Sequence, residues 1–68
     1  MPLTVETEQE ADGRWLAEVP DLPGVMAYGA TRQEAVDRAQ ALSLRVLADR
    51  LDHGDPLPQL AHVFAVTP

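Results

Sequence analysis

The residues of this sequence that could do chemistry gather near the end of one predicted helix. A short acidic cluster surrounds a histidine there, made of Asp49, Asp52, His53 and Asp55. Carboxylates beside a histidine can hold a divalent metal for hydrolysis, but solvated charges are ordinary at a helix end, where a histidine suits the negative end of the dipole. The other histidine, His62, is not spaced from His53 as in a His-Glu-x-x-His site. We therefore expect no metal site.

Nucleophilic and phosphate chemistry are not predicted either. Cysteine is absent, which excludes a thiolate nucleophile, a zinc–thiolate site and a disulfide. Ser43 falls in the middle of a predicted helix with no paired base in view, and no glycine-rich phosphate loop occurs. We expect no catalytic residue, no cofactor and no enzymatic activity.

Acidic residues instead indicate a surface that could bind a protein. Glu6, Glu8, Glu10 and Asp12 follow the first predicted hairpin. Five basic residues against eleven carboxylates give a net charge of −6, which repels nucleic acid and attracts a basic protein. The hairpin could therefore steer a basic partner; alternatively, its charges form a solvated strand face that discourages edge-to-edge pairing. We expect no direct binding to nucleic acid or to a membrane.

The elements that position these residues begin with three strands. Residues 3–9 alternate between apolar and polar types, as in a strand with one solvated face, and residues 14–19 form the return strand. Two prolines in residues 20–24 end that strand, because proline removes a ladder donor, and the proline–glycine pair of this loop fits a type II turn. A third strand follows at residues 25–30.

The register of the first hairpin depends on the length of its turn. Gly13 suits the positive φ that a three-residue turn requires. Such a turn pairs Thr7 with Ala17, whereas a two-residue turn would reverse the faces of the return strand. We favour the three-residue turn, although it places Glu6 opposite Glu18, a like-charge pair.

A single long helix is predicted over residues 31–53. Thr31 and Glu34 form a capping box at its start, and Gly54 follows where a glycine commonly ends a helix. One apolar stripe of this helix is expected to face the sheet. A second apolar stripe lies on a different side of the helix, rotated from the first about the helix axis. The first stripe comprises Ala35, Val36, Ala39, Leu42, Val46 and Leu47.

The last predicted element is a short strand at residues 60–67. It follows a stiff connector at residues 55–58, in which each X-Pro pair avoids helical geometry. The element order is then β-β-β-α-β, an α+β fold of two layers in which one long helix packs on an antiparallel sheet. A chain of 68 residues allows one domain, residues 1–68. No signal peptide or membrane span is predicted, so we expect a soluble, cytoplasmic protein.

The second apolar stripe of the helix predicts association between copies of the chain. A domain this small buries only about 60% of its unfolded surface, and one three-stranded sheet covers only one helix face. We expect a homodimer or homotetramer, in which the last strand could be exchanged across the stiff connector. The predicted interface comprises Ala41, Leu44, Ala48, Leu51 and Phe64.

Three blocks of the sequence resemble the HicB-like antitoxins. They are Glu-Val-Pro-Asp-Leu-Pro-Gly-Val at residues 18–25, Gly-Ala-Thr-Arg-Gln-Glu-Ala at residues 29–35 and Gly-Asp-Pro-Leu-Pro at residues 54–58. Their order and spacing match the family pattern over most of the chain. Val25 stands where the family often has cysteine. Full-length members often continue into a DNA-binding segment, so this short form is not expected to repress a promoter alone.

The resemblance implies a truncated RNase H-like sheet and the antitoxin half of a type II toxin–antitoxin pair. The partner would be HicA-like, a small basic ribonuclease with a double-stranded-RNA-binding-type fold and a catalytic histidine. The expected function is neutralisation of this mRNA-cleaving toxin by covering its active site. The alternatives are a solitary structural or ligand-binding homo-oligomer and, third, a degenerate RNase H-like nuclease.

The candidate partner-binding residues combine the acidic hairpin, one loop and one aromatic side chain. The loop at residues 20–24 could contact the toxin, although turn formation alone accounts for its sequence. Tyr28 and Trp15 could anchor an interface or pack in the core, and burial is favoured for Trp15. The partner-binding set is Glu6, Glu8, Glu10, Asp21, Leu22 and Tyr28.

Overall fold

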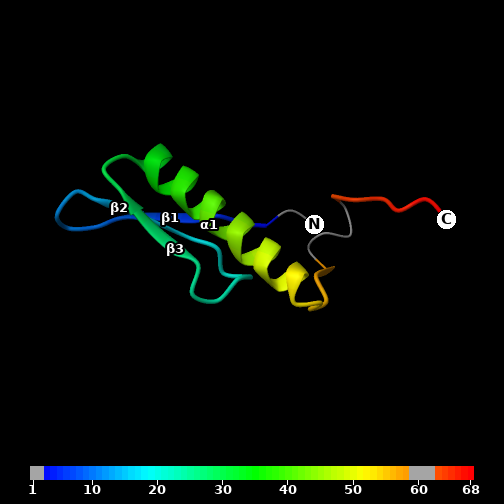
Figure 1. The fold of residues 1–68 in the computed structure, drawn as a ribbon. Helices are drawn as coiled ribbons and strands as arrows, with labels where there is room; N and C mark the ends of the chain where they lie inside the picture. The colour runs from blue at the N-terminus through cyan, green and yellow to red at the C-terminus, as the bar shows by residue number, and fades with distance from the viewer. Residues whose placement is uncertain (1–2, 59–62) are drawn as a thin grey trace.

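A three-stranded antiparallel sheet, with one long helix across one of its faces, forms the body of the molecule (Figure 1). The computed structural model describes residues 3–58 and 63–68. Strands β1 (Glu6–Gln9), β2 (Trp15–Glu18) and β3 (Met26–Gly29) lie side by side in that order, and helix α1 covers Arg32–Asp52. The predicted α+β class is confirmed.

The β1–β2 hairpin adopts the favoured register. Thr7 pairs with Ala17 and Glu6 with Glu18, and Gly13 has a φ of 91°, in the region that favours glycine. Strand β1 starts later than predicted. In this register residue 4 falls opposite Pro20, whose nitrogen cannot donate to the ladder.

Asp12 stabilises the turn of this hairpin. Its carboxylate accepts hydrogen bonds from the Arg14 backbone N–H (3.1 Å) and from the Arg14 guanidinium (2.8 Å). These two hydrogen bonds hold the pKa of Asp12 below its ordinary value. The ionised carboxylate therefore stabilises the turn above the ordinary pKa of an aspartate, and this contribution is lost as the pH falls through the lowered pKa.

The β2–β3 connection consists of two consecutive turns that direct Leu22 inward. The Leu22 N–H donates to the Val19 carbonyl (2.9 Å), and the Val25 N–H donates to the Leu22 carbonyl (3.0 Å). The second turn is the predicted type II turn, with Gly24 at a φ of 87°. The Leu22 side chain is 0% exposed and packs with Val19, Val25 and Leu47. This loop is therefore part of the core.

Small residues bring the first half of α1 close to the sheet. Ala17 of β2 packs with Ala35 and Ala39 of α1, and all three are buried. Gly29 of β3 lies so near α1 that a Cβ there would come within 2.5 Å of the Ala35 backbone nitrogen. Trp15 packs against this cluster but is only half-buried. It is therefore less buried than the sequence predicted.

Both ends of α1 follow local signals in the sequence. The Thr31 hydroxyl accepts from the Glu34 N–H (3.1 Å), as predicted, whereas the Glu34 carboxylate pairs with Arg38 (2.7 Å). At the other end Gly54 has a φ of 76°. The N–H groups of residues 54 and 55 donate to carbonyls of the last turn (both 3.0 Å), which is a Schellman motif.

Replacing Thr31 with alanine should lower the free energy of unfolding by about 1 kcal/mol, because the Glu34 N–H loses its acceptor. Urea denaturation followed by circular dichroism measures this change. Thr31→Ser keeps the acceptor and serves as the control, with an expected change of only a few tenths of a kcal/mol. Equal losses in the two variants would show that the hydroxyl does not cap the helix.

The prediction of a final strand at residues 60–67 is wrong for the residues that the structure describes. Residues 63–67 form no strand and are exposed. Phe64 lies beside α1, whereas the end of the chain runs away from the sheet and helix (Figure 1). Residues 60–62 of that prediction lie outside the described residues. Apolar residues in alternation indicate a segment able to pair, but a strand exists only beside a hydrogen-bonded neighbour.

Candidate protein-binding surfaces

The sheet face opposite α1 carries carboxylates toward β1 and apolar side chains toward β3. Side chains alternate between the two faces along a strand, so the register defines two rows across this outer face. One row is Glu8, Leu16 and Tyr28, and the other is Glu6, Glu18 and Met26. We call these six residues the acidic–apolar face.

The acidic–apolar face is open to solvent because α1 packs on the other side of the sheet. Met26 is 47% exposed, and Tyr28 is also exposed. A hollow of about 90 Å³ on this face is lined by Glu6, Glu8 and Glu18, together with Thr7 and Leu16. Carboxylates beside exposed apolar side chains suit a partner that presents both positive charge and apolar contacts.

The structure brings together half of the predicted partner-binding residues. Glu6, Glu8 and Tyr28 share the acidic–apolar face. Glu10 is half-buried at the end of the hairpin, and Asp21 is exposed but lies in the β2–β3 loop. Leu22 is a correction: its side chain is fully buried because it fills the core beneath the two turns, so it is not available to a partner.

Sequence reasoning missed Glu18 and Met26 as members of this face. Because side chains alternate between the two faces of a sheet, the favoured register would have placed Glu18 on the same face as Glu6 and Glu8. Met26 joins this face through the pairing of β2 with β3. The number of residues in the two-turn loop between these strands does not by itself fix their register.

Tyr28 is held in place through both its ring and its backbone. The Arg14 guanidinium lies 4.6 Å from the centroid of the Tyr28 ring, within the range of a cation–π interaction. The Tyr28 carbonyl accepts a hydrogen bond from Arg38 of α1 (2.9 Å). The aromatic side chain is therefore presented to solvent in a defined position, as an interface anchor requires.

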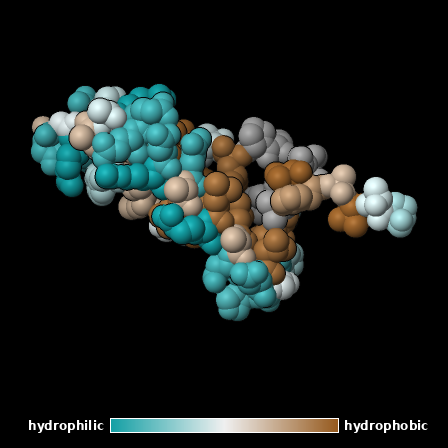
Figure 2. All heavy atoms as spheres, turned by 45° about the horizontal axis from the view of Figure 1, so that its top comes forward, coloured by the Kyte–Doolittle hydropathy of each residue, from teal (hydrophilic) through white to brown (hydrophobic). Residues whose placement is uncertain are grey.

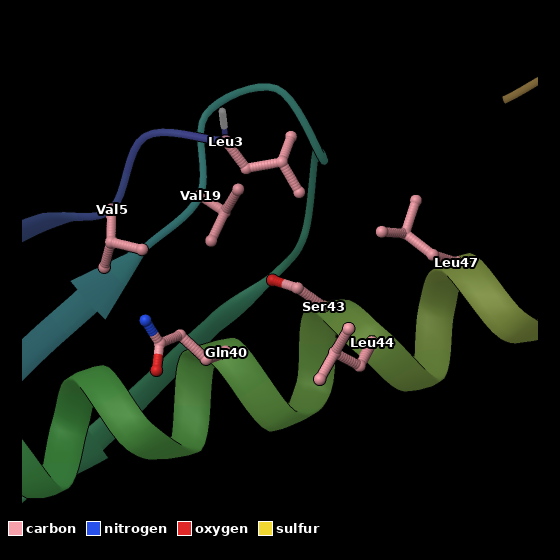
Figure 3. Close-up of a pocket in the computed structure, with 7 residues that line it drawn as sticks. All are labelled: Leu3, Val5, Val19, Gln40, Ser43, Leu44 and Leu47. Carbon is pink, nitrogen blue, oxygen red and sulfur yellow. The ribbon is translucent and has the colours of Figure 1, made fainter. Parts of the chain in front are cut away.

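An apolar groove beside α1 forms the second surface. A hollow of about 310 Å³ separates the helix from the entry to β1 and the end of β2 (Figure 3). From the sheet side it is lined by Leu3, Val5 and Val19, and from α1 by Gln40, Ser43, Leu44 and Leu47. None of these side chains is charged. The Ser43 hydroxyl is buried and donates to the Ala39 carbonyl (2.8 Å).

A second hollow of about 200 Å³ continues this surface along α1 and shares Leu44 and Leu47 with the first. Its lining residues are Leu44, Leu47, Ala48, Leu51 and Phe64. We call the two hollows together the α1 groove. Figure 2 shows hydrophobic side chains gathered toward the C-terminal end of the molecule, whereas the hairpin end is hydrophilic.

The α1 groove brings together four of the five residues predicted for an oligomer interface. Leu44, Ala48, Leu51 and Phe64 line it, and Leu44 is 68% exposed. Ala41 is half-buried and lines neither hollow. Gln40 and Ser43 were not predicted here, because polar residues inside an apolar stripe are not distinguished by hydrophobic periodicity.

The acidic cluster around His53 lies at the exposed end of α1. The His53 Nδ1 atom is 2.7 Å from the Asp49 carbonyl oxygen and 3.7 Å from the Asp49 carboxylate. Asp52 and Asp55 are exposed. Within residues 3–58 and 63–68, no three histidine, cysteine or acidic side chains are grouped closely enough to hold a metal ion. His62 lies outside the described residues.

Comparisons of the chain with models of known families, with curated proteins and with solved structures each found no match. Among the described residues, no helix is both long and apolar enough to cross a membrane. What the protein does must therefore be inferred from the chemistry of its two open surfaces.

Proposed function

We propose that this protein is an antitoxin-like binding module that neutralises a small basic, HicA-type RNA-cleaving toxin by covering its active site. It is proposed to act without chemistry of its own. The observation that carries the proposal is the acidic–apolar face, where Glu6, Glu8 and Glu18 adjoin exposed Met26 and Tyr28.

Charge supports a basic partner. The net charge of −6 and the carboxylates of β1 and β2 would speed encounter with a cationic protein. The apolar side chains of β3 would then slow dissociation, because buried aromatic and methionine side chains supply much of the affinity at protein interfaces.

The order of the described elements supports the finer fold assignment. A three-stranded antiparallel meander followed by a long helix, β1-β2-β3-α1, is compatible with the truncated RNase H-like sheet that the three sequence blocks imply. We propose this assignment together with the function.

A two-step experiment tests the function. Tagged protein is used to capture partners from its host lysate, and a captured basic protein of about 60–90 residues is expected to dissociate at high salt. The purified partner should cleave RNA alone and lose that activity when one equivalent of this protein is added. If only the tagged protein is recovered, under conditions in which a known control complex stays bound, the alternative of a solitary homo-oligomer would be favoured.

Charge reversal at Glu6 and Glu8 should reduce the association rate with that partner about tenfold at low salt. The double variant Glu6→Lys/Glu8→Lys also removes the like-charge pair with Glu18, so folding should be preserved. Stopped-flow mixing over a series of salt concentrations should show a flatter salt dependence.

The matched control is Asp52→Lys/Asp55→Lys, which makes the same change in net charge at the exposed end of α1. Its effect on the association rate should be at most about threefold, because screening weakens charges beyond roughly 10 Å. Equal effects of the two double variants would mean that net charge, and not the acidic–apolar face, controls association.

A further inference from the structure

The accessible surface of this chain is larger than a compact monomer of its size should have. A monomer of 7.4 kDa is expected to expose roughly 4,200 Å², whereas this chain exposes 5058 Å². The radius of gyration is 13.9 Å, against about 11 Å for a compact domain of this length. The C-terminal segment, whose end runs away from the sheet and helix (Figure 1), contributes to this excess of roughly 850 Å².

Two apolar features of the described residues are open to solvent. The first is the α1 groove, where Leu44 is 68% exposed. The second is the C-terminal segment at residues 63–68, where Phe64 is 67% and Val66 is 94% exposed. The segment carries no charged side chain, and neither does the groove.

The absence of charge decides where two copies can meet. Each chain has a net charge of −6, so contacts through the carboxylate-bearing surfaces would be repulsive. The uncharged groove and the uncharged segment are complementary to each other, because each loses exposed apolar area when they pack together.

We propose that two copies form a reciprocal dimer, in which the C-terminal segment of each copy, residues 63–66, lies in the α1 groove of the other. This inference does not depend on the proposed toxin. In the single chain Phe64 lies at the hollow of about 200 Å³ and does not line the hollow of about 310 Å³, so in the dimer both hollows are available to the segment of the partner copy.

Val66 of the partner copy is the side chain that we assign to that larger hollow, against Leu3, Val5 and Leu44. The Gln40 amide extends from α1 toward the sheet side of the hollow (Figure 3). There it can both donate to and accept from the backbone of an incoming extended segment. Leu57 packs against the core of its own chain, so it anchors the connector from which the segment departs.

Size-exclusion chromatography with light scattering on the full chain at about 100 μM tests this proposal. The unmodified protein should be a dimer. Leu44→Glu in the groove and Val66→Asp in the segment should each weaken dimerisation at least about thirtyfold, because a carboxylate would be buried without a partner. Both positions are exposed in the single chain, so circular dichroism should show that each variant is folded. Met26→Glu, on the acidic–apolar face, should remain a dimer.

Mixing the two disrupted variants distinguishes exchange from simple face-to-face contact. In a mixed pair, the intact segment of the Leu44→Glu chain meets the intact groove of the Val66→Asp chain. In a dimer of either variant alone, every contact between groove and segment contains one altered member. The mixture should therefore recover a heterodimer.

A monomer at 100 μM would overturn the proposal, and so would a dimer that Val66→Asp does not weaken. Failure of the mixture to associate would overturn the reciprocal exchange. None of these results bears on toxin binding, which is tested through the acidic–apolar face.

Discussion

Gly29→Ala should unfold the domain or displace α1 from the sheet. An ideal Cβ at this position would lie 2.5 Å from the Ala35 nitrogen and 2.9 Å from the Glu34 carbonyl carbon. Both are backbone atoms in the first turn of α1, so no side chain can rotate to make room and the helix itself must move. Overpacking of this kind costs about 1–3 kcal/mol and occasionally more, which is comparable to the ~3–5 kcal/mol that so small a core supplies.

Gly13→Ala is the matched control, because it adds the same methyl group without a clash. No atom lies within 4 Å of a Cβ at Gly13, although its φ is 91°. Its cost should be about 1 kcal/mol, from the unfavourable left-handed backbone alone. Urea denaturation compares the two variants, and a loss at Gly29 no larger than that at Gly13 would contradict the close packing of β3 on α1.

Leu22→Ala should lower the free energy of unfolding by about 3 kcal/mol. The Leu22 side chain is 0% exposed, and truncation of a buried leucine removes its burial and leaves a cavity among Val19, Val25 and Leu47. In a domain of this size such a loss leaves little remaining stability. Thermal denaturation should show a melting temperature lowered by more than 10 °C.

Met26→Ala provides the comparison, because it shortens an apolar side chain that is 47% exposed. Its effect should stay within about 0.5 kcal/mol. If the two truncations changed stability equally, the β2–β3 loop would not contribute to the core.

The burial of Leu22 changes the interpretation of the loop that most resembles an antitoxin motif. In the segment Pro20–Gly24 the prolines and the glycine shape two turns, and the leucine between them fills the core. Its sequence is explained by folding, so the resemblance of this loop gives no separate support for partner binding, and the proposal rests on the acidic–apolar face.

The sequence alone determined the features that depend on a few neighbouring residues. The Thr31 cap, the Gly54 helix end and the Gly24 turn each follow from a hydrogen bond or a φ angle within about five residues. Gly13 favoured the observed β1–β2 register but did not fix it, because a two-residue turn was also compatible with the sequence. These signals were sufficient for the α+β class, the three strands and the helix.

Only the tertiary structure decided which of these residues act together. Met26 and Tyr28 join the glutamates of β1 through pairing across β2, and Leu22 is buried because α1 returns over the β2–β3 loop. Residues 63–67 have the apolar composition of a strand, yet they form none within the described chain. Cross-strand neighbours, burial and strand formation all require contact with segments distant in sequence, and a local pattern does not specify which segment will provide it.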